Sequence, residues 1–244
     1  MPRLTAAFFL LLSFVVLPCA SAGEKLKSQR VVFKFANKTR EAHFFVPEKR
    51  GNLPVLVLLH GYGNNALDMI HEWQELAERE GILLAAPDAV EGMEWNPRWD
   101  SPAFMHEVVN QARGLHAIDD NRIYLFGHSA GAQYALILAL IDPNYYAAAA
   151  MHSGSLPEAM NPALLQPRRH MPLAIWSGDL DSIFPVDKVR ETKRVLDAHG
   201  FNVQLSVIAR HDYKYSAVSS TVNPQAWQFL SAVRLTYEPL TTNH

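Results

Sequence analysis

Cysteine is nearly absent from this sequence, and neither sign of charge dominates it. Cys19 is the single cysteine in 244 residues. Because it lies within the segment 1–22, removal of that segment would leave no disulfide, no thiolate metal site and no cysteine nucleophile. The formal net charge is −2, a balance that does not favour a nucleic-acid or an anionic-membrane partner. Such a chain must be held together by its hydrophobic core.

The first 22 residues are typical of a secretory signal peptide. Arg3 precedes an apolar run, and the run is followed by the small residues Ala20, Ser21 and Ala22. This order of a positive start, an apolar stretch and a small-residue site predicts cleavage after Ala22. A retained anchor is the alternative, but it needs about 20 apolar residues. We therefore expect a secreted or periplasmic protein without a stable membrane anchor.

Beyond residue 22, short apolar strands alternate with amphipathic helices, which is typical of an α/β fold with a mostly parallel central sheet flanked by helices. The sequence predicts strands over 31–35, 42–46, 54–59, 82–86, 122–126, 146–151, 173–176 and 203–208. It predicts helices over 68–80, 103–118, 130–141, 186–199 and 224–237. With no repeat or linker in between, we expect one domain over 23–244.

The segment Gly-His-Ser-Ala-Gly over 127–131 fits the motif Gly-x-Ser-x-Gly. It directly follows one predicted strand and opens a predicted helix, which is the setting in which this motif is a nucleophile elbow. The outer glycines are required because the turn is too tight for side chains, and the helix N-terminus favours developing negative charge. The motif alone occurs by chance, but with these flanks it predicts Ser129 as a nucleophile.

A serine nucleophile also needs donors for the oxyanion of the tetrahedral intermediate. One donor should be the amide of Ala130, the residue after the nucleophile. The other should come from the loop after the 54–59 strand, which reads His-Gly-Tyr-Gly over 60–63. Its glycines allow the backbone to bend toward Ser129, so the Tyr62 amide is the second candidate. The alternative is that these glycines only form a turn.

The acid and base of such a site follow the nucleophile in the order Asp or Glu, then His. Two aspartates compete in the loop after the 173–176 strand. Asp181 is preferred as the acid, and Asp179, directly after a glycine, is the alternative as a turn former or capping residue. His211 follows the 203–208 strand at the carboxyl edge of the sheet, where open α/β sheets place their sites, and is the candidate base.

Candidate substrate contacts come from aromatic residues in the long segment 88–102. Trp95 and Trp99, with Phe104 nearby, would form an aromatic wall, and His128 adjoins the nucleophile. Ordinary packing of a long loop is the alternative for these aromatics. The strands expected to end at 151 and to begin at 173 leave no room between them for a large lid domain.

At this point the chain resembles secreted esterases of the polyhydroxybutyrate depolymerase and feruloyl esterase type. The resemblance runs from about residue 53 to about residue 230, through the segments 53–63, 121–131, 147–153 and the Gly-x-x-Asp-x-x-x-Pro segment of 178–185. It implies the α/β-hydrolase fold, a triad of Ser129, Asp181 and His211, and neither a metal nor another cofactor. The implied substrates are carboxylic esters of short-acyl, feruloyl, acetyl-sugar or polyester type, small or linked to a polymer.

The chain departs from these esterases in one respect. They often have glycine just before the catalytic histidine, whereas Ala209 and Arg210 precede His211 here. Two other functions remain open from the residues alone. One is a serine peptidase of the same fold, and the other is a noncatalytic binding module on that fold.

Overall fold

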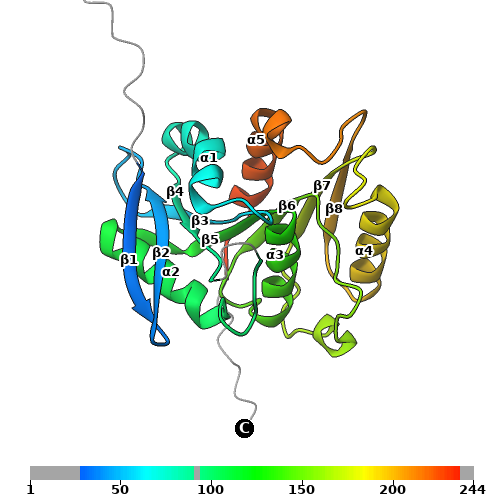
Figure 1. Cartoon of the computed structure of the whole chain (residues 1–244), viewed down its shortest axis with the longest axis horizontal. Helices are drawn as coiled ribbons and strands as arrows, with labels where there is room; N and C mark the ends of the chain where they lie inside the picture. Colours follow the sequence, from blue (N-terminus) through cyan, green and yellow to red (C-terminus); the bar gives the residue numbers. More distant parts are fainter. Residues whose placement is uncertain (1–27, 91–93, 237–244) are drawn as a thin grey trace, which may run out of the picture.

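An eight-stranded sheet runs through the protein, whose computed structural model describes residues 28–90 and 94–236 (Figure 1). The strand order is β1-β2-β4-β3-β5-β6-β7-β8. Strand β2 is antiparallel to β1 and to β4, and all the other pairs are parallel. This confirms the predicted mostly parallel sheet. The predicted signal peptide, 1–22, lies outside the described residues.

Each predicted strand and helix has a counterpart in the structure. The strands are β1 (Gln29–Phe35), β2 (Lys38–Phe45), β3 (Leu53–Leu59), β4 (Leu83–Pro87), β5 (Ile118–His128), β6 (Ala148–His152), β7 (Leu173–Gly178) and β8 (Val203–Ile208). The α-helices are α1 (Ala66–Glu80), α2 (Pro102–Leu115), α3 (Ala130–Ile141), α4 (Val186–Ala198) and α5 (Ser219–Ser231). Two short 3₁₀ helices are η1 (Pro162–Leu165) and η2 (Tyr215–Ala217).

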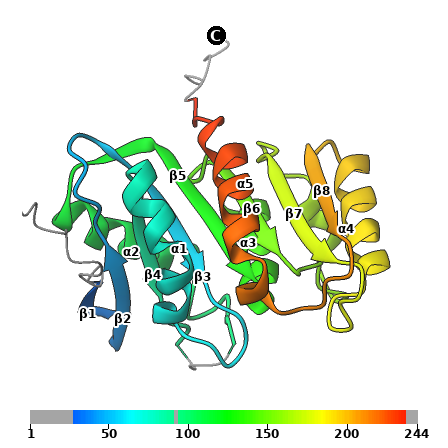
Figure 2. The ribbon, with the colours of Figure 1, turned by 90° about the horizontal axis from the view of Figure 1, so that it is seen from above.

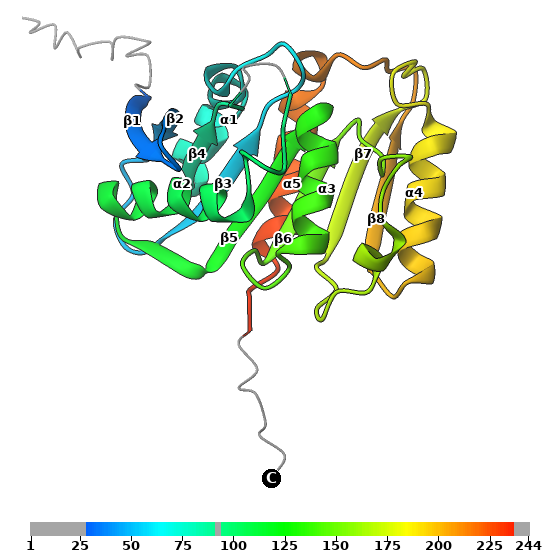
Figure 3. The ribbon, with the colours of Figure 1, turned by 60° about the horizontal axis from the view of Figure 1, so that its bottom comes forward.

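The helices form two layers, one on each face of the sheet. Helices α1 and α5 cover one face (Figure 2), and α2, α3 and α4 cover the other (Figure 3). Strand β3 is buried along its whole length because it meets both layers. Its Val55 and Val57 pack on the side of α2 and α3, whereas Leu56 and Leu58 pack on the side of α1 and α5. A strand between two apolar layers needs no polar face, which explains its continuous apolar run.

The prediction of the last helix is wrong at both ends. The helix was expected over 224–237, whereas residues 232–236 are not helical. The structure begins α5 at Ser219, and Pro224 lies inside it. Pro224 and Ser220 are both exposed, so water can reach the Ser220 carbonyl, which loses its helical partner to the proline. The exposed position makes this interior proline tolerable.

No large lid domain stands between β6 and β7. The chain forms only η1 there before it enters β7. The connections that lead into β4, β5, β6 and β8 each contain an α-helix. The connection between β6 and β7 is therefore the one parallel crossover in the described sheet without an α-helix to cover it. The predicted absence of a large lid is confirmed for this part of the described chain.

Two glycines fix the position at which α3 meets the sheet. A Cβ atom on Gly131 would lie 2.0 Å from the Leu59 carbonyl oxygen, and one on Gly127 would lie 2.2 Å from the Gly131 carbonyl oxygen. Both contacts are with backbone, so neither can be relieved by a side-chain rotation. The predicted need for small residues at both outer positions of the motif therefore has a steric cause.

Gly131→Ala is expected to destabilise the protein by several kcal/mol, as overpacking against rigid surroundings does, or to prevent folding. Gly114→Ala is the matched control, because a Cβ atom there meets nothing within 4 Å and alanine is favoured over glycine inside a helix by about 1 kcal/mol. Urea denaturation measures both. Equal midpoints for Gly131→Ala and the wild type would contradict the steric account.

Candidate active site

Ser129 lies in the turn that joins β5 to α3. Its φ is 59° and its ψ is −120°, in a region that residues other than glycine seldom occupy. Its amide donates to the His152 carbonyl (3.0 Å), and its own carbonyl accepts from the Gln133 amide (3.0 Å), which begins the helix. The side chain is 4% exposed. Backbone strain of this kind, held by the surrounding structure, is found most often at functional sites.

The Ser129 hydroxyl has one hydrogen-bond partner among the described residues, the phenol of Tyr213. Tyr213 Oη donates to Ser129 Oγ, and the Tyr213 ring lies 4.8 Å from the His128 ring, centroid to centroid. Tyr213 is two residues after His211, in the loop between β8 and η2. Sequence reasoning did not name Tyr213. Its only signal was its place beside the predicted base.

The glycine-rich loop after β3 packs directly against Ser129. A Cβ atom on Gly61 would lie 3.3 Å from Ser129 Cβ and 3.2 Å from His128 Cδ2, so only glycine lets the loop approach this closely without displacing a neighbour. In the part of the chain that the structure describes, no hydrogen bond from the Tyr62 or the Ala130 amide is formed. Both amides are therefore available to an oxygen atom at the nucleophile. The Tyr62 side chain is 58% exposed.

His60 and Trp95 hold this loop in place. His60 Nε2 accepts from the Ala89 amide (3.2 Å), and the His60 carbonyl accepts from Trp95 Nε1 (2.9 Å). The Trp95 ring is 7% exposed and stacks on Tyr134 of α3 at 5.5 Å. Trp95, predicted as part of a substrate wall, thus supports the loop from behind, which is the packing role given as the alternative.

The other two aromatics of the expected wall pack near the β1–β2 hairpin. Trp99 is half-buried, with Lys38 Nζ 4.5 Å from its ring centroid. Phe104 is fully buried under Arg40 and packs against Phe33 and Phe35. The structure does not bring Trp99 or Phe104 to Ser129, because the segment after β4 is drawn to the edge strands by these cation–π and aromatic contacts.

The two aspartates after β7 have different surroundings. Asp181 is 4% exposed, and its Oδ1 accepts from the amides of Ile183 (2.9 Å) and Phe184 (2.8 Å). Its Oδ2 is buried and has no protein partner among the described residues. Asp179 is exposed, and its Oδ1 accepts from the His211 amide (3.3 Å). Asp179 therefore caps the histidine loop, whereas Asp181 presents a free buried carboxylate oxygen.

His211 reaches the site because β7 ends in a glycine. A Cβ atom on Gly178 would lie 2.1 Å from the His211 carbonyl oxygen, and that carbonyl accepts from the Leu180 amide (2.9 Å). The preceding residue, Arg210, has a φ of 55°. Glycine adopts this left-handed conformation without strain, whereas a residue with a side chain is strained in it. His211 Nδ1 lies 3.9 Å from Asp212 Oδ1, and its buried Nε2 has no protein partner among the described residues.

Ser129, Asp181 and His211 occupy one neighbourhood without being bonded to one another. Over residues 28–90 and 94–236, no hydrogen bond joins any two of them. His128 is close enough to both Asp181 and His211 for their charges to act on its pKa. Catalytic hydrogen bonds are often long or open before substrate binds. The resting arrangement thus offers an unpartnered imidazole nitrogen, an unpartnered carboxylate oxygen and a hydroxyl held by Tyr213.

His128 and His152 form a buried, neutral pair beneath the nucleophile. Their Nδ1 atoms lie 3.1 Å apart, and the His128 ring packs against Tyr213 and Tyr215. Burial lowers the pKa of His128 to about 4 and the pKa of His152 to about 3. His128, predicted as a substrate contact, has its ring occupied by these protein contacts. Neither imidazole carries a charge at neutral pH.

These lowered pKa values predict a loss of stability in mild acid. The unfolded chain binds protons at a pKa near 6.5, above both folded values, so the stabilisation is complete above pH 6.5 and is lost as the pH falls toward 4. Each histidine contributes a slope of roughly 1.4 kcal/mol per pH unit in that range. Urea denaturation at pH 7 and at pH 4.5 should show that the free energy of unfolding falls less between the two pH values in His152→Asn than in the wild type. The exposed His199→Asn is the control, and an unchanged difference in His152→Asn would contradict the account.

One group of described residues has ligand atoms close enough to hold a metal ion. The ligand atoms of Glu41, His43 and Asp88 all lie within 4.8 Å of one another. Glu41 is already paired with Arg30, and Asp88 Oδ1 accepts from the Ala66 amide at the start of α1 (2.7 Å). Two of the three groups are therefore engaged in structural contacts, Glu41 between β1 and β2 and Asp88 at the start of α1.

Known proteins share this fold and parts of this sequence. A protein-family model described as "Putative esterase" matches residues 35–228. The chain is similar to "Putative esterase NocK" of Nocardia uniformis subsp. tsuyamanensis, with 32% identity over 153 residues, 58% of this chain and 43% of that protein. It is also similar to the poly(3-hydroxybutyrate) depolymerase of Ralstonia pickettii, with 26% identity over 141 residues, 47% of this chain and 29% of that protein. The chain thus spans less than half the length of these relatives.

A solved structure of a ferulic acid esterase matches 85% of this chain and 99% of its own, with a TM-score of 0.66 and 15% identity. At that identity the likeness concerns the fold alone, and it confirms the predicted α/β-hydrolase fold. The resemblance to esterases of the polyhydroxybutyrate depolymerase and feruloyl esterase type is confirmed as well. Because the family model spans well over half of the sequence, the chain belongs to this esterase family.

Proposed function

We propose that the protein is a serine carboxylic ester hydrolase with Ser129 as its nucleophile. The observation that carries the proposal is the strained Ser129 turn at the start of α3 with the Gly61 loop packed against it. A serine in this setting has the α3 N-terminus on one side and an unbonded loop amide on the other. Both features stabilise the negative charge that develops when the hydroxyl attacks an ester carbonyl.

The proposed reaction proceeds in two halves. Ser129 attacks the carbonyl carbon while His211 Nε2 takes its proton, and the amides of Tyr62 and Ala130 hold the oxyanion. His211 then gives the proton to the departing alcohol. Water, deprotonated by His211, attacks the acyl-enzyme and releases the acid. Asp181, through its free Oδ2, orients the imidazole and stabilises its protonated form, so the His211 ring must turn toward both partners when substrate binds.

The substrate class is tested by comparing esters with amides. We expect hydrolysis of p-nitrophenyl acetate and butyrate, and of feruloyl or acetyl-sugar esters, with little cleavage of peptide p-nitroanilides. Faster cleavage of the anilides would assign the site to a serine peptidase. Inactivity of the folded protein on every ester would overturn the proposal in favour of a noncatalytic binding module.

Tyr213 should favour the second half of the reaction. Its phenol donates to Ser129 Oγ, which is the attacking atom in acylation and the leaving atom in deacylation. A donor stabilises the free serine oxygen more than the esterified one, so it assists departure of Oγ. Tyr213→Phe is expected to slow deacylation about tenfold, the loss of roughly one hydrogen bond, and to produce a burst of p-nitrophenol as acyl-enzyme accumulates.

Tyr62→Phe is the control for the tyrosine experiment, because it removes an exposed phenol from the oxyanion loop and leaves the backbone amide in place. Stopped-flow measurements should show no burst in that variant. A Tyr213→Phe variant in which acylation and deacylation slow equally would contradict this role for Tyr213.

We also propose that the protein is exported, with residues 23–244 as the mature catalytic domain. The signal-like composition of residues 1–22 supports this proposal. No described helix is both long and apolar enough to cross a bilayer. N-terminal sequencing of the protein from its native host should give a chain that begins at Gly23. A chain that retains Met1 would overturn the proposal.

A further inference from the structure

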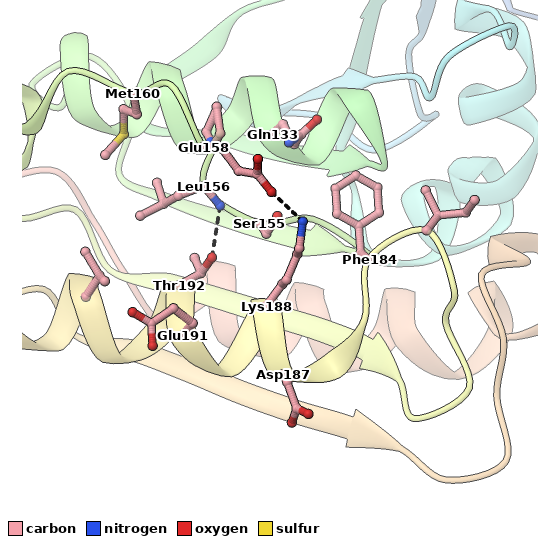
Figure 4. A pocket seen from close by; sticks show the side chains of 13 residues that line it. Gln133, Ser155, Leu156, Glu158, Met160, Phe184, Asp187, Lys188, Glu191 and Thr192 are labelled. Carbon is pink, nitrogen blue, oxygen red and sulfur yellow. Dashed lines mark hydrogen bonds and ion pairs between the residues drawn. The ribbon is translucent and has the colours of Figure 1, made fainter.

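An open groove of about 790 Å³ lies between α3 and α4, under the segment that follows β6 (Figure 4). Its walls come from α3 through Gln133, from the segment after β6 through Leu156 and Met160, and from α4 through Thr192 and Val195. The groove exists because the β6–β7 crossover contains only η1, so no α-helix fills the space between α3 and α4. Its size is within the range of pockets that bind small organic ligands.

One end of the groove adjoins the proposed catalytic residues. Gln133 lies one helical turn after Ser129 and donates its amide to the Ser129 carbonyl (3.0 Å). Phe184 donates its amide to Asp181 Oδ1 (2.8 Å). The groove is thus bordered at this end by residues whose amides are hydrogen-bonded to the nucleophile and to the acid.

The lining of the groove suits an uncharged, mainly apolar occupant. Its apolar surface comes from five side chains, those of Leu156, Met160, Ile183, Phe184 and Val195. The neutral polar side chains Gln133 and Ser155 also line it, whereas the Thr192 hydroxyl already accepts from the Leu156 amide (2.9 Å).

The charged side chains along the groove are all paired. Lys188 binds Glu158 across it at 2.5 Å, as Figure 4 shows. The other two pairs lie along α4, Asp187 with Arg190 at 2.9 Å and Glu191 with Arg194 at 2.8 Å. A charged ligand would therefore find no uncompensated partner among the described lining residues, and its desolvation would not be offset.

We propose that the groove between α3 and α4 binds the uncharged, apolar chain of the ester substrate and so sets its chain-length preference. The proposal rests on the proposed esterase function. The bound carbon chain of the substrate belongs either to the acyl part or to the alcohol part of the ester. The groove would recognise both by the same apolar contacts. Each methylene buried in the groove contributes roughly a fourfold gain in kcat/KM until the groove is filled.

The test fills the groove from two opposite walls with Val195→Trp on α4 and Met160→Trp on the segment after β6. Asp197→Trp is the matched control, because Asp197 is exposed on α4, and neither it nor its partner Lys193 lines the groove. Two series of esters are compared by kcat/KM, p-nitrophenyl esters from acetate to octanoate and alkyl acetates from methyl to octyl. If one of these two groove variants does not fold, the variant on the opposite wall carries the test.

We expect the octanoate-to-acetate ratio or the octyl-to-methyl ratio to fall at least tenfold in the groove variants, with acetate turnover changed less than about twofold. The series that responds identifies whether the acyl or the alcohol chain occupies the groove. Unchanged ratios in both series, with Ser129-dependent acetate hydrolysis intact, would overturn the groove proposal and leave the esterase function standing. Absence of Ser129-dependent hydrolysis in the wild type would overturn both.

Discussion

Ser129→Ala is expected to lower kcat for p-nitrophenyl butyrate by roughly 10⁴- to 10⁶-fold, because no other group can form the acyl-enzyme. The residual rate would come from the oxyanion donors and from substrate binding alone. KM should change little, since the hydroxyl contributes mainly to the transition state. The variant should remain folded, because the backbone strain at Ser129 does not depend on the hydroxyl.

Ser177→Ala is the matched control for the nucleophile. Ser177 is fully buried at the end of β7, and its hydroxyl has no hydrogen-bond partner among the described residues. Its loss removes an unsatisfied polar group and should leave kcat within about threefold of the wild type. If Ser177→Ala lost as much activity as Ser129→Ala, the effect would reflect damage to the buried site rather than loss of a nucleophile.

Asp181→Asn is expected to lower kcat by roughly 10³- to 10⁴-fold with little change in stability. The amide oxygen of asparagine can still accept from the Ile183 and Phe184 amides that now bind Oδ1. The negative charge that orients His211 and stabilises its protonated form is lost, and a neutral partner favours the wrong tautomer. Steady-state kinetics combined with thermal denaturation separate this loss from misfolding.

Asp179→Asn makes the same chemical change two residues away. Asp179 accepts from the His211 backbone amide, and asparagine preserves that acceptor. We expect activity within a few-fold of the wild type. A larger loss in Asp179→Asn than in Asp181→Asn would show that the acid had been assigned to the wrong aspartate.

Local patterns predicted the sheet and the position of the candidate nucleophile. The apolar run of β3 and the motif around Ser129 each report on their own immediate surroundings, since a buried strand must be apolar and a tight elbow must have glycine. The start of α5 was misplaced, because exposure of the helix face decides how much an interior proline costs and a local pattern does not report that exposure.

Contacts between distant segments could not be predicted in this way. Trp95 supports the Gly61 loop through the His60 carbonyl, 35 positions earlier in the chain. Tyr213 contacts Ser129 across 84 positions. Neither pairing leaves a periodicity or a spacing in the sequence, because both depend on which loops the sheet brings to its carboxyl edge. The aromatic residues near the site were therefore visible in the sequence, but their roles were not.

The most direct test of the central claim is covalent labelling with the organophosphate paraoxon, followed by peptide mass spectrometry. The serine nucleophile of an esterase attacks the phosphorus atom and displaces p-nitrophenol, so one diethylphosphoryl group per chain should appear on the peptide that contains Ser129, in step with loss of activity. Labelling of another residue, or loss of activity without an adduct on Ser129, would contradict the account.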